Sequence, residues 1–308
     1  MINVKNLISR IILYSILVVA VIYFYPAIMR FNWSDYKYRQ KEDGFDFYTD
    51  LSQEQFKVAR TLCLEFKRKF EKCYFPIKNK KRLKIYLFSG DKGYEKFCKK
   101  AKCEGTEFGF YAPGEKLLVV NTASGWGTLL HEIRHYFLST TKVKYPDWFE
   151  EGFAAFFEKF IGKVDEKKNE VFWLSFGYFN PWRFSEVMVV RGSSKLLLSD
   201  LFNQKKCIQS IARNFILFTH HKGLLPGLLQ ELRKGTDSRG AVETIFKKDL
   251  PTIEQEWNNW IDESVKTRDC KLLVASQLFT SLELQNWCQQ NNLIWSEEKG
   301  IFVCLPGL

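Results

Sequence analysis

The sequence has few histidines, no internal repeat and no low-complexity segment. Four of its 308 residues are histidine, so a histidine-rich metal-binding tract is excluded, and the lack of repeats excludes a solenoid. None of the eight cysteines shows the paired C-x-x-C spacing of a zinc ribbon. No nucleic-acid-binding motif accompanies the formal net charge of +11, so we expect no nucleic-acid partner. A basic surface beside an anionic membrane explains this charge more simply.

Two of the four histidines lie in one short motif. The segment His131-Glu132-Ile133-Arg134-His135 reads H-E-x-x-H. Residues i and i+4 of a helix lie on the same face, so both imidazoles can point at one metal ion. Glu132 then lies beside the metal without binding it, where its carboxylate can take a proton from a metal-bound water. The motif therefore predicts a zinc site with Glu132 as the general base, although an amphipathic helix with a buried histidine pair can carry the same spacing.

A four-coordinate catalytic zinc needs a third protein ligand. The metzincin pattern requires glycine at position 138 and histidine at position 141, but the sequence has Leu138 and Thr141. That pattern is therefore excluded. Further along, the chain reads Trp148-Phe-Glu-Glu-Gly152, and it continues with apolar and aromatic residues. This segment offers two adjacent carboxylates at a usable distance from the histidines.

The motif Trp148-x-x-Glu151-Gly-Phe-Ala, with Glu158 seven residues after Glu151, resembles the second active-site helix of gluzincin metallopeptidases, among them the peptidase MA-like family. The resemblance implies that His131, His135 and Glu151 bind Zn²⁺ and that the substrate is a peptide or protein. Glu150 is the competing ligand, because adjacent helical residues are about 100° apart and only one can face the metal. Glu158 either orients a metal ligand or is a solvated side chain.

These residues predict a zinc-dependent metallopeptidase, a hydrolase in which a metal-activated water attacks a peptide bond. Gluzincins also use a tyrosine or histidine to stabilise the oxyanion, and here Tyr178, His220 and His221 are the candidates for that role. The alternative is a catalytically inactive zinc-binding scaffold or peptide-binding protein tethered to a membrane.

An apolar segment near the N-terminus predicts a membrane anchor. Ile11–Met29 is almost wholly apolar and is flanked by Arg10 and Arg30, and as a helix it would be roughly 28 Å long, near the thickness of the hydrocarbon core. No small-x-small cleavage site follows it, so we expect residues 1–31 to form an uncleaved single-pass anchor. The even number of cysteines favours an extracytoplasmic catalytic domain, periplasmic or at the cell surface.

The remaining pattern predicts an α+β fold, with a small mixed sheet packed on the H-E-x-x-H helix and a mostly helical C-terminal part. A helix is expected over Leu51–Cys73, with Ser52 as its N-cap. Strands are expected over Leu83–Phe88, Phe108–Tyr111 and Lys116–Asn121. Because gluzincins bind an extended peptide at the edge of this sheet, Phe108–Tyr111 is the candidate peptide-binding strand, with an ordinary hairpin strand as the alternative.

Domain boundaries follow from changes in composition. Residues 32–50 are polar and predict a linker, and residues 51–266 form the expected gluzincin-like catalytic domain. Within it, the aromatic-rich Val164–Ser185 predicts a long loop or lid, and helices are expected from Lys206 onward. Residues 267–308 form a C-terminal extension whose role the sequence does not indicate.

Overall fold

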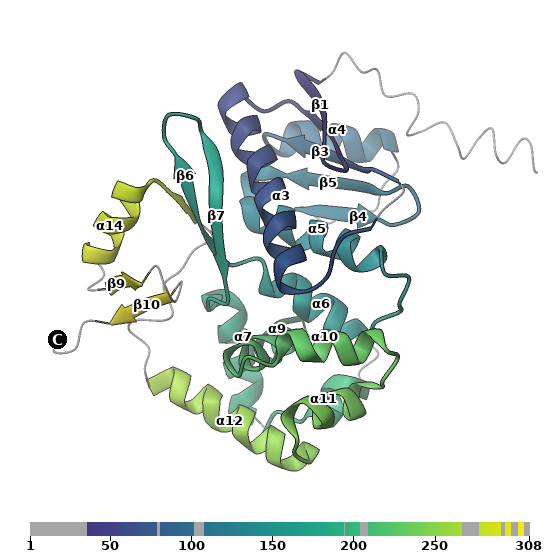
Figure 1. The fold of residues 1–308 in the computed structure, drawn as a ribbon, viewed down its shortest axis with the longest axis vertical. Coiled ribbons are helices and arrows are strands. Elements are labelled where there is room, and N and C mark those ends of the chain that lie inside the picture. Colours follow the sequence, from purple (N-terminus) through teal and green to yellow (C-terminus); the bar gives the residue numbers. More distant parts are fainter. Residues whose placement is uncertain are drawn as a thin grey trace, which may run out of the picture.

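The computed structural model describes residues 36–78, 81–101, 108–193, 195–203, 209–266, 277–290, 293–296 and 301–304. This part of the chain mixes helices with small sheets (Figure 1), which confirms the predicted α+β class. The apolar segment 11–29, predicted as a membrane anchor, lies outside the described residues. Among the residues that are described, no helix is both long and apolar enough to cross a bilayer.

The largest sheet has five strands in the order β1-β2-β3-β5-β4. The strands are β1 (Tyr38–Glu42), β2 (Phe45–Thr49), β3 (Leu83–Phe88), β4 (Gly109–Ala112) and β5 (Leu117–Asn121). The β2–β3 and β3–β5 pairs are parallel, and the β1–β2 and β4–β5 pairs are antiparallel. β4 is therefore an edge strand, as its predicted peptide-binding role requires.

Residues 32–50 were expected to be a linker, but most of the described part of this range forms strands. β1 and β2 make a hairpin around Asp43 and Gly44, both with positive φ, and an Asp-Gly pair is a favoured two-residue hairpin turn. Successive residues of β1 alternate between half-buried and exposed, and three of the five are charged, so its composition resembles that of a linker. Phe45 and Phe47 are buried and anchor β2 in the core.

Helices cover both faces of the sheet (Figure 1). On one face, α3 (Gln53–Cys73) begins with the predicted capping box of Ser52 and Gln55 and packs against α5 (Trp126–Ser139), which follows the short 3-10 helix η2 (Thr122–Ser124). α4 (Asp91–Ala101) packs on the other face, where its Phe97 contacts Tyr86. α5 carries the H-E-x-x-H motif, so the sheet supports this helix as the sequence predicts.

The predicted lid over residues 164–185 is instead mostly regular structure. β6 (Phe160–Asp165) and β7 (Glu170–Phe176) form an antiparallel hairpin, and α7 (Pro181–Ser193) follows. In β7, Val171 and Leu174 are buried whereas Phe172 is exposed, so the aromatic-rich composition belongs to a strand with one face on the core. β8 (Gln277–Phe279) pairs in parallel with β6, so the C-terminal extension contributes a strand to this sheet.

The second half of the described chain is mainly helical, as predicted. Its helices are α6 (Asp147–Phe156), α8 (Leu198–Asn203), α9 (Gln209–His221), α10 (Leu225–Arg233), α11 (Ser238–Phe246) and α12 (Leu250–Lys266), and the C-terminal extension adds α14 (Ser281–Gln290), β9 (Leu293–Ser296) and β10 (Ile301–Cys304). α6 and α9 pack closely, since a Cβ atom on Gly152 would lie 2.8 Å from the backbone of Ala212. This contact fixes α6, which carries Glu150 and Glu151, against α9.

Candidate metal centre

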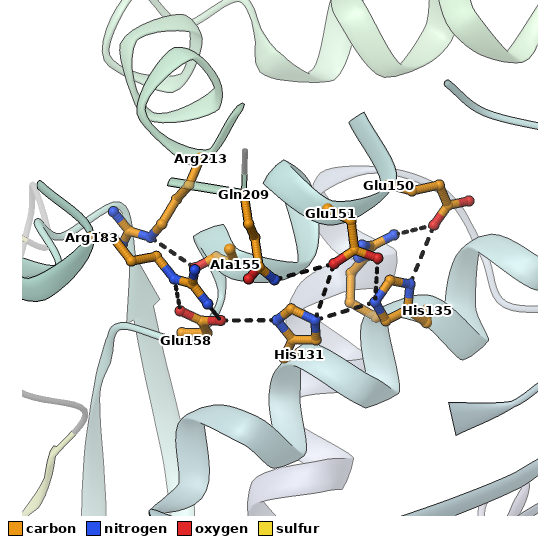
Figure 2. Close-up of polar contacts among 10 residues, drawn as sticks. His131, His135, Glu150, Glu151, Ala155, Glu158, Arg183, Gln209 and Arg213 are labelled. Carbon is orange, nitrogen blue, oxygen red and sulfur yellow. Dashed lines mark hydrogen bonds and ion pairs between the residues drawn. The ribbon is translucent and has the colours of Figure 1, made fainter. Parts of the chain in front are cut away.

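α5 and α6 bring two histidines and one glutamate together (Figure 2). The Nε2 atoms of His131 and His135 lie 3.3 Å apart. The carboxylate oxygens of Glu151 lie 3.8 Å from Nε2 of His131 and 3.7 Å from Nε2 of His135. The three side chains thus point at one small volume, and one donor atom from each lies within 4.8 Å of the other two.

This donor set fits a zinc ion. Ligand atoms about 2.0–2.1 Å from a tetrahedral Zn²⁺ are separated from one another by about 3.3 Å. The two Nε2 atoms are 3.3 Å apart, and each lies slightly farther, at 3.8 and 3.7 Å, from a different oxygen of Glu151. Two imidazole lone pairs that face each other at such a distance repel unless a cation lies between them. Burial, together with the positive charge of Arg134, lowers the pKa of His135 to about 3, which keeps this ring in the neutral form that binds metals.

His131 is oriented by a carboxylate behind it. Its Nδ1 atom lies 3.0 Å from Oε1 of Glu158, which favours a proton on Nδ1 and a free lone pair on Nε2. Arg183 donates two hydrogen bonds to the same carboxylate, at 2.6 and 2.5 Å, and Asn180 donates a longer one. Burial alone would raise the pKa of Glu158, but the hydrogen bonds from His131 and Arg183 lower it to about 2. Of the two sequence interpretations of Glu158, the ligand-orienting one matches the structure.

His135 has a corresponding partner in Glu150. Nδ1 of His135 lies 3.4 Å from Oε2 of Glu150, and Nη1 of the fully buried Arg134 donates to the same oxygen at 2.6 Å. Burial would raise the pKa of Glu150, but these two partners lower it. Glu150 therefore lies behind a histidine whereas Glu151 faces the metal position, so the structure favours Glu151 over its neighbour as the third ligand.

Glu151 is itself held by a residue at the first turn of α9. Nε2 of Gln209 donates a hydrogen bond of 3.1 Å to Oε2 of Glu151. The contact leaves Oε1 of Glu151 directed toward His135. Each of the three candidate ligands thus has a partner that restricts its orientation, and preorganised ligands of this kind bind metals more tightly.

Glu132 lines the cleft beside the three candidate ligands. Burial raises the pKa of its carboxyl group above the usual value, although the charge of His131 opposes this shift. A carboxylate with a raised pKa is a stronger base near neutral pH. The structure places Glu132 where the sequence expects the general base, next to His131 and outside the ligand set.

The cleft has a volume of about 1100 Å³ and is large enough for several residues of a peptide. The edge strand β4 forms one wall and lies along α5, because Gly109 approaches Thr128 and the hydroxyl of Tyr111 lies 2.9 Å from that of Ser139. Two exposed aromatic side chains, Phe108 and Trp182, also line the cleft.

The three residues expected to stabilise an oxyanion do not line the cleft that the described residues form. Tyr178 is buried, and burial raises its pKa. His220 packs against the ring of Phe156, and His221 packs against Trp260. The sequence analysis did not identify Arg183 and Gln209 as site residues, because they come from α7 and α9 and no spacing relates them to the H-E-x-x-H motif.

No model of a known protein family matches the chain, and no curated protein matches it either. The function is therefore inferred from the side chains of the site. These side chains are two histidines and a glutamate placed so that they could hold one metal ion, with Glu132 beside them in an open cleft.

Proposed function

We propose that the protein is a zinc-dependent metallopeptidase of the gluzincin type, a hydrolase of peptide bonds. The observation that supports it most is the convergence of His131, His135 and Glu151 with Glu132 at their side, in a cleft open to solvent. Two imidazoles and one carboxylate leave a fourth position of a tetrahedral zinc for water, which is the arrangement of a catalytic site. A purely structural zinc site would be closed by a fourth protein ligand.

When bound, zinc would lower the pKa of water to about 7 and polarise the peptide carbonyl. Glu132 would accept the proton of the attacking water, because its carboxylate lies in the cleft and has a raised pKa. The same group would then pass the proton to the amine that leaves. Glu158 and Glu150 keep the two imidazoles in the orientation that these steps need.

The substrate would bind as an extended strand along β4. This strand is at the sheet edge and lines the cleft, so the backbone groups on its outer side can pair with a peptide. Such pairing is tolerant of sequence, because backbone atoms make the hydrogen bonds. The exposed rings of Phe108 and Trp182 would add apolar contacts to substrate side chains.

The experiment is hydrolysis of a broad library of fluorogenic peptides by the full-length chain, with and without a chelator. The proposal expects cleavage that the chelator removes and that added zinc restores. Absence of cleavage across the library, in protein that holds zinc, would contradict it. Cleavage that continues in chelator would contradict the role of the metal.

A second candidate is an inactive zinc-binding scaffold or peptide-binding protein. The observation that favours it is that Tyr178, His220 and His221 all lie outside the lining of the cleft. Loss of one oxyanion donor reduces turnover by about 10²–10³-fold. A scaffold would bind zinc and peptides in the same library assay and would release no product.

We further propose that the chain is anchored in a membrane through residues 11–29, with its catalytic part outside the cytoplasm. The apolar sequence and the even number of cysteines support this location, whereas the free thiols of Cys63, Cys73 and Cys98 add no disulfide to that support. Protease added to intact cells or spheroplasts should digest the catalytic part. Full protection, together with reduction of all eight cysteines, would contradict the proposed orientation.

A further inference from the structure

One cationic side chain of the cleft takes no part in holding the metal ligands. Lys159 follows Glu158 directly and lines the same cleft. Its side chain is half-buried. Within the part of the chain that the structure describes, it makes no ion pair and no side-chain hydrogen bond. Burial lowers the pKa of the Lys159 amine, which is the effect expected for an ammonium group without an anionic partner.

The charged groups around Lys159 do not neutralise its positive charge. Arg183, Arg213 and Glu158 are the charged groups that act on it. Glu158 already accepts two hydrogen bonds from Arg183 and one contact from His131, as Figure 2 shows. The buried Arg213 donates to the carbonyl oxygens of Ala155 and Tyr178, and among the described residues no carboxylate pairs with it. Two cations are thus left without a carboxylate of their own, and a further anion here would be stabilised.

Lys159 lies at the end of the cleft where α5 begins. A Cβ atom on Gly127 would lie 2.5 Å from the carbonyl oxygen of Glu158, so the segment that carries Lys159 packs on the first turn of α5. His131 comes four residues after Gly127, about one turn further along the helix. A ligand group bound by Lys159 would therefore be close to the metal position.

We propose that Lys159 binds a carboxylate of the peptide substrate, within a few residues of the bond that is hydrolysed. This inference rests on the proposed function and names its substrate class, peptides with a negatively charged group beside the scissile bond. Both a free C-terminal carboxylate and an acidic side chain offer this chemistry. Arg183 is unsuited to the role, because its Nε and Nη2 donors already bind the carboxylate of Glu158.

The test measures binding separately from turnover. The zinc-loaded, full-length Glu132→Gln protein is titrated with N-acetylated peptides of one apolar sequence. One pair ends in a free acid or an amide, and a second, amidated pair carries an internal glutamate or glutamine. We expect at least one acidic member to bind about tenfold or more tightly than its neutral partner, as a charge-assisted contact does. Lys159→Gln should remove this preference, and Lys159→Arg should keep part of it.

Lys168→Gln is the matched control, because Lys168 is exposed on the turn between β6 and β7 and should leave the preference unchanged. A preference for the free acid assigns the C-terminal carboxylate, and a preference for glutamate assigns an acidic side chain. No binding, or a preference that survives Lys159→Gln, overturns the inference. Hydrolysis by the wild type is measured in parallel, so Lys159-dependent binding without turnover refutes only the proposed peptidase activity.

Discussion

His131 and Glu158 are 27 residues apart in the sequence, yet Nδ1 of His131 lies 3.0 Å from Oε1 of Glu158. The contact joins the helix that carries the histidine to the turn after α6. Arg183 completes the chain of contacts from a third element, α7. The side chains of Arg183, His131 and Glu158 are 9%, 11% and 16% exposed, so water competes weakly with their hydrogen bonds.

Glu158→Gln should weaken zinc binding by about 10- to 100-fold, the usual effect of removing the partner of a metal-binding histidine. The substitution keeps the size of the side chain and removes the charge that fixes the His131 tautomer. Competition with a chelator of known affinity measures the change. Glu166→Gln is the control, because Glu166 is exposed on the β6–β7 turn. Equal zinc affinity in both variants would show that Glu158 does not position His131.

One zinc ion should bind per chain, through His131, His135 and Glu151. The two Nε2 atoms have the separation that a tetrahedral ion needs, and the two oxygens of Glu151 lie 3.8 and 3.7 Å from them. His135→Ala should remove the metal and Glu151→Gln should weaken its binding, whereas His221→Ala should retain one equivalent because His221 lies outside the cleft. Metal analysis after dialysis decides the matter. A full equivalent of zinc in His135→Ala would refute the assigned ligands.

Gly152→Ala should destabilise the fold by roughly 1–3 kcal/mol, as overpacking of a close contact does. The new Cβ atom would lie 2.8 Å from the backbone of Ala212, which cannot move as a side chain can. Gly192→Ala is a matched control, since nothing lies within 4 Å of its Cβ position in α7, and it should not destabilise. Urea unfolding of the two variants gives the comparison. Equal stability would mean that α6 and α9 separate easily.

The histidine pair could be predicted from the sequence because its geometry is local. The i, i+4 spacing fixes both rings on one face of a helix whatever surrounds it. Glu151 was preferred over Glu150 through the family resemblance, and the structure gives the physical distinction, since Glu150 contacts Arg134 and His135. The partners Arg183 and Gln209 come from helices 25 and 58 residues away from the carboxylates they hold, and no local pattern encodes such contacts.

The strands that the sequence analysis does not predict are also fixed by contacts with other segments. Four of the five residues of β1 are polar or charged, and they are half-buried or exposed. This composition resembles that of a linker, and only the pairing with β2 shows that the segment is a strand. The aromatic-rich composition of residues 164–185 predicts a loop or lid, whereas the structure forms the β6–β7 hairpin, whose pairing register shifts between Lys163 and Val164. Pairing and packing against neighbouring strands determine these strands more than intrinsic propensity does.

Acid should destabilise the zinc-loaded protein partly through His220. Burial against Phe156 lowers the pKa of His220 below its usual value of 6.5, so the folded state prefers the neutral ring. As the pH falls below about 6.5, the unfolded state takes up the proton first, and stability is lost until the folded pKa is passed. His220→Gln should reduce the slope of unfolding free energy between pH 7 and pH 5, relative to His221→Gln. An unchanged slope would refute this linkage.

Substitution of Glu132 distinguishes an enzyme from an inactive scaffold. Its carboxylate lies beside His131 and outside the ligand set, so Glu132→Gln should leave the zinc content near one equivalent and the fold intact. The amide keeps the size of the side chain but cannot accept the proton of the attacking water. Peptide hydrolysis should therefore fall by about 10²-fold or more, the contribution of a positioned general base.

The comparison with Glu151→Gln makes this result specific. That variant removes a ligand, so it should lose zinc and activity together, and added zinc should restore part of both. Glu132→Gln should hold its zinc and stay inactive at any zinc concentration, because the missing group is a base. Steady-state hydrolysis and metal content are measured on the same preparations. Equal hydrolysis by wild type and Glu132→Gln would refute the mechanism, since some other residue would then have to remove the proton from water.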